Sequence, residues 1–325
     1  MVFPVIHSTL DPGALTDEVA RRYALAPPVR CRLINRANND FYEVLTGGPK
    51  FALRVAKADF RPPAEYAFEL DLLEHLHRAG AHVPGPLRQQ DGTLFFQLEA
   101  PEGVRTVALF TWLAGRPFTK ALTVADAADM GEGLARLHLA GRSFHSAHTR
   151  HVDTAAYLAG HMPALLAMLR DNPDEHDFYA GAHAAVVRAL NGIDPAAVPR
   201  GAVHGDYQFA NVLRLADGSI GALDFDTCGI GYLAQDIFTF VWRSDMEIRD
   251  EAVNSAFIAG YERARPLTGS ERACLPLFRV ARDLVMAATY AILINRVGPV
   301  PGFDGDFAPF TALARRHLSD AGLAA

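Results

Sequence analysis

The sequence is poor in cysteine, with only Cys31, Cys228 and Cys274 among its 325 residues. No two of them form a C-x-x-C pair, and three cysteines cannot all be joined in disulfide bonds within one chain. A small scaffold held together by disulfides is therefore excluded. Free thiols favour a reducing compartment, and we expect a cytoplasmic protein.

The sequence also lacks a basic excess and a long apolar run. Lys and Arg total 31 against 37 Asp and Glu, whereas nucleic-acid-binding proteins are usually basic. The longest apolar run, residues 285–294, is too short to span a bilayer. The first residues show no basic stretch followed by an apolar core, so they do not read as a signal peptide. We therefore expect neither nucleic acid nor a membrane as partner.

Two short polar motifs stand out in a chain that is 50% hydrophobic and long enough for two lobes. Residues 204–211 read His-Gly-Asp-Tyr-Gln-Phe-Ala-Asn, and residues 220–226 form an apolar strand that ends Asp-Phe-Asp. A carboxylate can orient an acceptor hydroxyl and take its proton, while Asn and Asp oxygens suit Mg²⁺ bound to phosphates. The pattern predicts transfer of the γ-phosphate of ATP to a hydroxyl, with Asp206 as base and Asn211 and Asp224 as magnesium ligands.

The order of these motifs is that of a kinase, with two departures. A protein-kinase catalytic loop reads H-R-D-x-x-x-x-N and is followed by D-F-G. Here Gly205 replaces the Arg, and Asp226 replaces the last Gly. In this form the chain resembles the aminoglycoside phosphotransferase family, which also holds type II homoserine kinases and choline kinases. The resemblance runs from about Leu33 to Asp236.

That resemblance implies an α+β, protein-kinase-like fold of two lobes. Residues 1–112 would form the N-lobe, a small nucleotide-binding β-sheet with one helix, and residues 113–325 the larger, mainly helical C-lobe. Hydrophobic spacing agrees with this division. It predicts strands at 31–33, 41–45, 51–56, 95–98 and 106–111, and helices at 11–23, 64–79, 124–140, 154–170, 178–191, 235–243, 250–265, 270–296 and 307–323.

A kinase-like site also needs a cation on the nucleotide phosphates, braced by a carboxylate from a helix. Arg54 occupies the position of the usual Lys, and the resemblance implies that Glu69 braces it. Glu65, one helical turn earlier, is the alternative. The glycine-rich phosphate loop is missing, and residues 36–40, which include Asn38, take its place. Their backbone amides could face phosphate, or the segment could be an ordinary hairpin.

Adenine recognition is expected at the end of the last N-lobe strand. Backbone groups around Thr111 would bond the base, with Phe110 or Trp112 beside its ring. In the family an Asp placed like Asp236 holds the backbone of the catalytic loop.

Two further residues receive supporting roles. His204 is expected to pack beneath the catalytic loop and bond its backbone. Asp226 would contact a second metal ion or fix the loop after the strand.

The acceptor is predicted only by class, as the hydroxyl of a small molecule of the homoserine-kinase or aminoglycoside/choline-kinase type. Arg279, Arg282 and Arg296 could meet an anionic acceptor, although helical spacing explains them equally well. One alternative is a Ser/Thr protein kinase of the bacterial stress-response type. Another is a nucleotide-binding pseudokinase, suggested by Arg in place of Lys. The sequence contains no indication of an oligomeric state.

Overall fold

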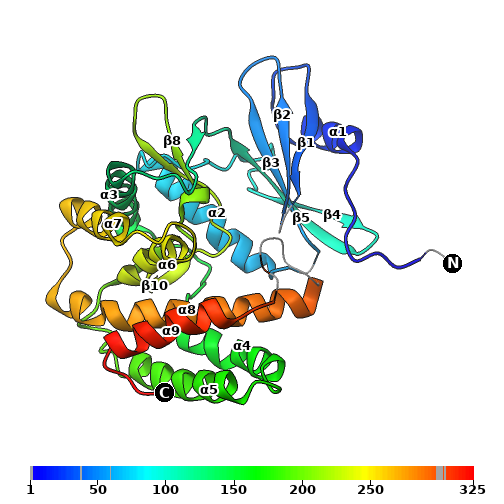
Figure 1. Cartoon of the computed structure of the whole chain (residues 1–325). Coiled ribbons are helices and arrows are strands. Elements are labelled where there is room, and N and C mark those ends of the chain that lie inside the picture. The colour runs from blue at the N-terminus through cyan, green and yellow to red at the C-terminus, as the bar shows by residue number, and fades with distance from the viewer. Residues whose placement is uncertain (1–2, 37–38, 59, 298–302, 304) are drawn as a thin grey trace. The chain divides into compact units, whose positions relative to one another are not determined.

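The computed structural model describes residues 3–36, 39–58, 60–297, 303 and 305–325 (Figure 1). The chain forms two compact units and passes from one to the other several times. The division into lobes of residues 1–112 and 113–325 stays a prediction. Unit 1 consists of Met1–Pro117, Ala140–Arg150 and Val212–Asp226, and unit 2 of Phe118–Leu139, His151–Asn211 and Thr227–Ala325.

Unit 1 is built on an antiparallel five-stranded sheet in the order β1-β2-β3-β5-β4 (Figure 1). One helix precedes the first strand and a second lies between the third and fourth strands. The elements are α1 (Pro12–Arg22), β1 (Arg30–Arg36), β2 (Asn39–Leu45), β3 (Phe51–Ala56), α2 (Pro63–Arg78), β4 (Phe96–Ala100) and β5 (Gly103–Thr111).

Helix α1 covers one face of this sheet. Its start is capped by Asp11, whose carboxylate accepts the N–H of Ala14 at 2.8 Å. Its buried Leu15 and Val19 join a core with the inward-facing residues of the strands, each contributing roughly 1.5–3 kcal/mol by burial. From the sheet this core takes Tyr42, Val44, Leu53, Val55, Val107 and Leu109, among others.

Strand alternation then fixes which residues lie on the opposite face. Because Leu53 and Val55 face the α1 core, Arg54 between them must point the other way. By the same rule Asn39 shares the face of Arg54, two register positions away on β2. Glu69 of α2 meets Arg54 on this side. The polar site of unit 1 is therefore a consequence of the apolar pattern of two strands.

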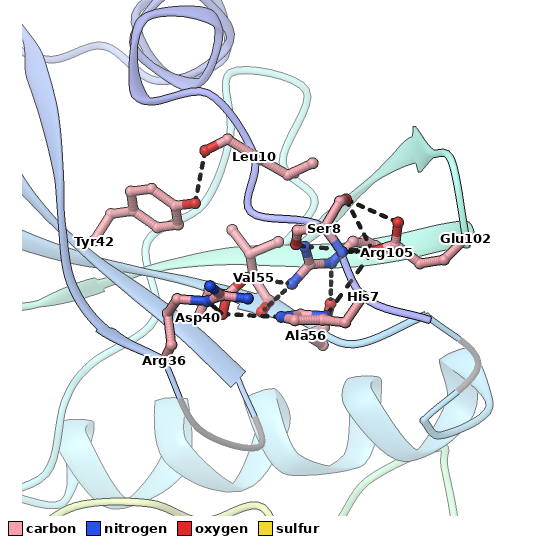
Figure 2. A network of polar contacts seen from close by, with 10 residues as sticks. All are labelled: His7, Ser8, Leu10, Arg36, Asp40, Tyr42, Val55, Ala56, Glu102 and Arg105. Carbon is pink, nitrogen blue, oxygen red and sulfur yellow. Dashed lines mark hydrogen bonds and ion pairs between the residues drawn. The ribbon is translucent and has the colours of Figure 1, made fainter. Parts of the chain in front are cut away.

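The segment before α1 is fastened to the sheet by buried polar contacts (Figure 2). Arg105 is fully buried, and its guanidinium donates to Asp40 Oδ2 at 2.8 Å and to the carbonyl oxygen of Ser8 at 2.8 Å. His7 Nε2 lies 3.2 Å from the other oxygen of Asp40, and Ser8 donates to Glu102. Asp40 follows Asn39 directly, so this network holds the start of β2 in place.

A small second sheet of unit 1 carries the Asp-Phe-Asp motif. Strands β6 (Arg116–Pro117), β8 (Val212–Arg214) and β9 (Ile220–Ala222) pair in the order β6-β8-β9. The short helix η1 (Gly141–Ser143) also belongs to unit 1. Strand β9 ends immediately before residues 223–226, which places Asp224 and Asp226 in the loop that follows it.

Unit 2 is mostly helical (Figure 1). Helices α4 and α5 pack against each other and against α8, and α9 also packs against α8. Its elements are α3 (Val124–Ala140, of which Ala140 belongs to unit 1), α4 (Thr154–Met168), α5 (Pro173–Asn191), β7 (Arg200–Val203), η2 (Phe209–Asn211), β10 (Gly229–Tyr232), η3 (Leu233–Asp236), α6 (Ile237–Glu247), α7 (Glu251–Ala264), α8 (Gly269–Val297) and α9 (Ala308–Asp320).

The predicted bounds of helices α5 and α6 differ from the structure, and α6 ends at Glu247 where the prediction ends at residue 243. Helix α5 begins at Pro173, whereas the hydrophobic pattern predicts its start at residue 178. Asn172 caps the helix by accepting the N–H of Glu175, and Pro173 at the first position suits a helix start. The acidic first turn is exposed, so it lacks the apolar period that marks the rest of the helix. Within the described residues, no helix is both long and apolar enough to cross a membrane.

Candidate active site

The loop before η2 has a backbone that requires glycine at its second position. Gly205 has a φ of +81°, in the left-handed region, and a Cβ there would lie 2.2 Å from the carbonyl oxygen of Thr227. An Arg, as protein kinases have at this position, would not fit. The departure from H-R-D noted in the sequence therefore has a steric cause.

The loop presents Asp206 with both carboxylate oxygens engaged. Oδ1 accepts from Arg282 Nη2 and Oδ2 from Asn211 Nδ2, each at 3.0 Å. The same amide nitrogen donates to the backbone oxygen of Asp206 at 3.0 Å. Each carboxylate oxygen has two acceptor positions, so an acceptor hydroxyl could still donate to this side chain, which is about one-third exposed (35%). The arrangement suits a fixed general base.

Behind the loop, a buried carboxylate holds its backbone. Asp236 accepts the N–H of His204 at 2.6 Å and that of Gly205 at 2.8 Å, while His138 Nε2 lies 3.1 Å away. Burial alone would raise the pKa of Asp236, but the hydrogen bond from His138 and the charges and donors around it lower that pKa. Asp236 is thus held as a carboxylate beneath the loop.

Other contacts complete the loop. His204 is fully buried, and its Nδ1 accepts the N–H of Asp206 at 3.3 Å. Tyr207 is also buried and donates to the carbonyl oxygen of Met130 at 2.9 Å. The hydroxyl of Thr239 donates to the carbonyl oxygen of Tyr207 at 2.7 Å. These contacts fix the loop from several elements of unit 2.

In unit 1 the loop after β9 carries Asp224 in an uncommon conformation. Its φ is +62°, in the left-handed region that residues other than glycine rarely adopt. Such strain is found preferentially at functional sites. The side chain is exposed, and its charge adds to those that act on Arg54 in the same unit.

Arg54 and Glu69 form a buried, two-point ion pair. Arg54 Nη1 lies 2.5 Å from Oε1 and Nη2 2.9 Å from Oε2, and the two side chains are at most 6% exposed. Burial would raise the pKa of Glu69, but Arg54 and Arg61 outweigh it and lower that pKa to about 2. Glu65, the alternative partner, instead pairs with Arg150 at 3.0 Å. Glu69 is therefore the carboxylate that contacts Arg54.

A second arginine, which the sequence analysis missed, joins this pair. Arg61 Nη2 lies 2.6 Å from Glu69 Oε2 and 3.1 Å from Asp226 Oδ1, and its Nη1 donates to the backbone oxygen of Asp226 at 2.9 Å. Arg54 Nη1 contacts the same Oδ1 at 3.0 Å. Arg61 precedes the Pro62-Pro63 break and has no periodic pattern around it, so nothing in the sequence marks it as buried.

The residues predicted to bind adenine and the phosphates have different surroundings in the structure. Phe110 is buried beside Arg54, whose guanidinium carbon lies 5.2 Å from its ring centre. The N–H of Thr111 donates to the carbonyl oxygen of Gly85 at 2.8 Å, which leaves that group unavailable to a base. Trp112 stacks under the Lys50 ammonium at 3.6 Å. Asn38 lies outside the described residues, and binding roles for these residues stay predictions.

The side chains predicted to bind magnesium are Asn211 and Asp224, an amide and a carboxylate. Among the described residues no three His, Cys, Asp or Glu side chains form a metal-binding group. Asn211 donates twice through Nδ2, to the backbone oxygen and to Oδ2 of Asp206. Its amide oxygen is of the kind that suits a hard cation drawing its other ligands from a carboxylate and from phosphate oxygens.

The sheet with its helix, followed by a helical part that holds the H-G-D-x-x-x-x-N loop, defines a protein-kinase-like fold. Solved structures of other proteins share it, two kinases among them. The microcompartment-associated aminopropanol kinase has a TM-score of 0.66 and 24% identity, and covers 96% of this chain and 99% of its own. The amicoumacin kinase hAmiN, in complex with AMP-PNP, Ca²⁺ and Ami, has a TM-score of 0.71 and 18% identity, and covers 96% and 93%.

Sequence comparison identifies the family. The model of the phosphotransferase enzyme family (APH) matches residues 30–274. A homoserine kinase of Xanthobacter autotrophicus is 30% identical over 231 residues, which cover 70% of this chain and 68% of that protein. This chain belongs to the phosphotransferase enzyme family and is an enzyme of the kinase type. The predicted fold class and family are thus confirmed.

Proposed function

We propose that this protein is an ATP- and Mg²⁺-dependent kinase that phosphorylates the hydroxyl of a small amino alcohol in the cytoplasm. The observation that carries the proposal is the Asp206 carboxylate, fixed by Asn211 and Arg282 on a loop that Asp236 supports. Family membership supports the reaction class, and the AMP-PNP and Ca²⁺ bound to the amicoumacin kinase support a nucleotide and a divalent cation.

In this mechanism Asp206 orients the acceptor hydroxyl and takes its proton as the oxygen attacks the γ-phosphorus. The bond to the β–γ bridging oxygen breaks, and ADP leaves. Arg54, braced by Glu69, binds the phosphates. Asn211 and Asp224 would hold the magnesium, which when bound neutralises charge on the phosphate oxygens.

Two relatives support the proposed acceptor class. Homoserine and aminopropanol, the acceptors that two relatives are named for, are both small molecules with an amino group and a hydroxyl. Arg282 contacts Asp206, so an acceptor placed on that carboxylate would come close to a guanidinium. This favours an acceptor that also carries an anionic group, such as homoserine, over one that does not.

The test is acceptor-dependent release of ADP. The protein is incubated with ATP and Mg²⁺ against amino alcohols, aminoglycosides, sugars and a casein-like protein. We expect turnover with amino alcohols, and a loss of a hundredfold or more in Asp206→Asn with nucleotide binding retained. The exposed Asp217→Asn, which makes the same chemical change, is the control.

Three results would contradict the proposal. Phosphorylation of the protein substrate alone would indicate a protein kinase. Nucleotide binding without turnover on any acceptor would indicate a pseudokinase. Unchanged turnover in Asp206→Asn would show that Asp206 is not the general base.

A further inference from the structure

The carboxylate of Asp226 lies in an anion site made by three side chains of unit 1. Arg54 and Arg61 reach its Oδ1 at 3.0 and 3.1 Å, and Asn39 donates through Nδ2 to its Oδ2. These residues come from β3, from the loop before α2 and from the start of β2. Two guanidinium groups and an amide therefore converge on one aspartate.

The donors are held rigidly. Glu69 binds Arg54 through both of its oxygens and Arg61 through Oε2, and a two-point contact of this kind fixes the plane of a guanidinium. Both arginine side chains are 6% exposed and Glu69 is fully buried. Asn39 is held next to Asp40, which the network of Figure 2 anchors. The donors of this site are therefore preorganised by contacts within the protein.

One aspartate does not use all the donors of this site. Arg61 Nε is buried and has no hydrogen-bond partner in the part of the chain that the structure describes. Buried donors in folded proteins are nearly always paired, so this nitrogen is a donor that a further acceptor could use. A phosphate chain offers several oxygens where the carboxylate offers two.

Charge explains why the site would not hold both anions at once. The charges of the two arginines, Glu69 and Asp226 sum to zero, and Asp224 adds a further negative charge that acts on Arg54, so no net attraction remains for a phosphate while Asp226 is in place. Withdrawal of Asp226 leaves the two arginines and Glu69 with a net charge of +1. Asp226 ends the loop that follows β9, close after Asp224 with its left-handed backbone, and its side chain is 11% exposed. It belongs to neither β3 nor α2, so its displacement breaks no backbone hydrogen bond of those two elements.

We propose that Asp226 acts as an internal substitute for phosphate, which the nucleotide displaces, and that Arg61 then becomes a second phosphate ligand beside Arg54. This inference rests on the proposed kinase function and deepens it. Nucleotide binding competes with the chain's own carboxylate. The apparent affinity for phosphate is therefore the intrinsic affinity multiplied by the fraction of molecules in which Asp226 has left the site.

The test uses the full chain and inorganic tripolyphosphate as the probe, measured by calorimetry with EDTA to exclude metal. Asp226→Asn keeps the size of the side chain and removes its charge. We expect it to bind the probe about tenfold more tightly than the unmodified protein. Asp217→Asn makes the same change on an exposed turn of unit 1 and should leave the affinity unchanged.

Arg61 is tested in the same assay. Arg61→Gln should weaken binding about tenfold, while the exposed Arg88→Gln should not change it. Arg61→Lys, which keeps the charge and loses the planar group, should give an intermediate affinity. If the melting curve of Asp226→Asn shows that this variant does not fold, Asp226→Ser is used in its place. Arg61→Lys replaces Arg61→Gln on the same criterion.

Either of two results would overturn the inference. One is tripolyphosphate bound no more tightly by Asp226→Asn or Asp226→Ser than by the unmodified protein. The other is an affinity for tripolyphosphate that is the same in Arg61→Gln or Arg61→Lys as in the unmodified protein. The assay needs no turnover, so a protein that phosphorylates no acceptor but follows this ranking would contradict the proposed function alone.

Discussion

The two oxygens of Asp206 are held by neighbours from different elements, Asn211 of η2 and Arg282 of α8. If Arg282 orients this carboxylate, Arg282→Gln should lower kcat about 10- to 100-fold and leave the KM for ATP unchanged, since a misdirected base weakens the chemical step. Steady-state kinetics measures both constants. Arg272→Gln, on the exposed face of the same helix, is the control. An unchanged kcat would contradict the assignment.

Glu69 should make the stability of the protein sensitive to acid. Its pKa is lowered from 4.5 to about 2 by Arg54 and Arg61, which outweigh burial. A carboxylate with a depressed pKa stabilises the folded state fully above its unfolded pKa, and this contribution is lost as pH falls from about 4.5 to about 2. The difference corresponds to roughly 3 kcal/mol.

The corresponding prediction is that Glu69→Gln is less stable than the unmodified protein at pH 7. The difference should narrow between pH 5 and pH 2, because protonation removes the same charge from the unmodified protein. Urea unfolding at a series of pH values measures it. Glu99→Gln, an exposed residue of β4, should leave the acid dependence unchanged. Parallel stability curves for Glu69→Gln and the unmodified protein would contradict the prediction.

At the scale of elements, helices α3 and α7 approach each other through glycine. A Cβ on Gly131 would lie 1.9 Å from the carbonyl oxygen of Phe257, and one on Gly260 1.9 Å from that of Ala128. Because backbone atoms stand in the way, Gly131→Ala must push the helices apart, and we expect a loss of about 3 kcal/mol. Thermal or urea unfolding measures it.

The control for this substitution lies in α4. Gly160 is exposed in the helix, and a Cβ there would meet no atom within 4 Å. Gly160→Ala should therefore stabilise the protein by about 0.5–1 kcal/mol, the usual gain of Ala over Gly in a helix. Equal effects of the two substitutions would show that the spacing of α3 and α7 is not set by glycine.

Elements with a strong apolar period are the ones that the sequence predicts well. Strands β1 to β5 and helices α2 and α8 lie where hydrophobic spacing places them, because each buries one face. Among the site residues, the alternation of β3 is enough to place Arg54 opposite the core. The contacts of Arg61, Arg282 and His138 were not predicted. They depend on which elements meet in space, and a charged residue in a loop or on a helix usually faces water.

At the scale of the whole molecule, the chain crosses between its compact units several times. Residues 212–226, which carry β8, β9 and the Asp-Phe-Asp motif, belong to unit 1, while the loop before them belongs to unit 2. The two compact units and the predicted lobes are different divisions of the chain, and the lobes of residues 1–112 and 113–325 stay a prediction. The periodicity of hydrophobic residues predicts single helices and strands. Which unit an element belongs to depends on long-range pairing, such as that of β6 with β8.

Nucleotide binding should stabilise the folded chain by an amount that rises with the logarithm of the nucleotide concentration above its Kd. A ligand that binds only the folded state, at 100 times its Kd, stabilises it by about 2.7 kcal/mol. AMP-PNP with Mg²⁺ should therefore raise the melting temperature by several degrees, which a thermal scan measures. Asp206→Asn, which alters the proposed base, should keep this rise, whereas Arg54→Gln should lose most of it. Arg88→Gln is the control for the loss of a guanidinium. An equal rise in Arg54→Gln would show that the nucleotide does not depend on the buried arginine, and would leave Arg54 with a structural role alone.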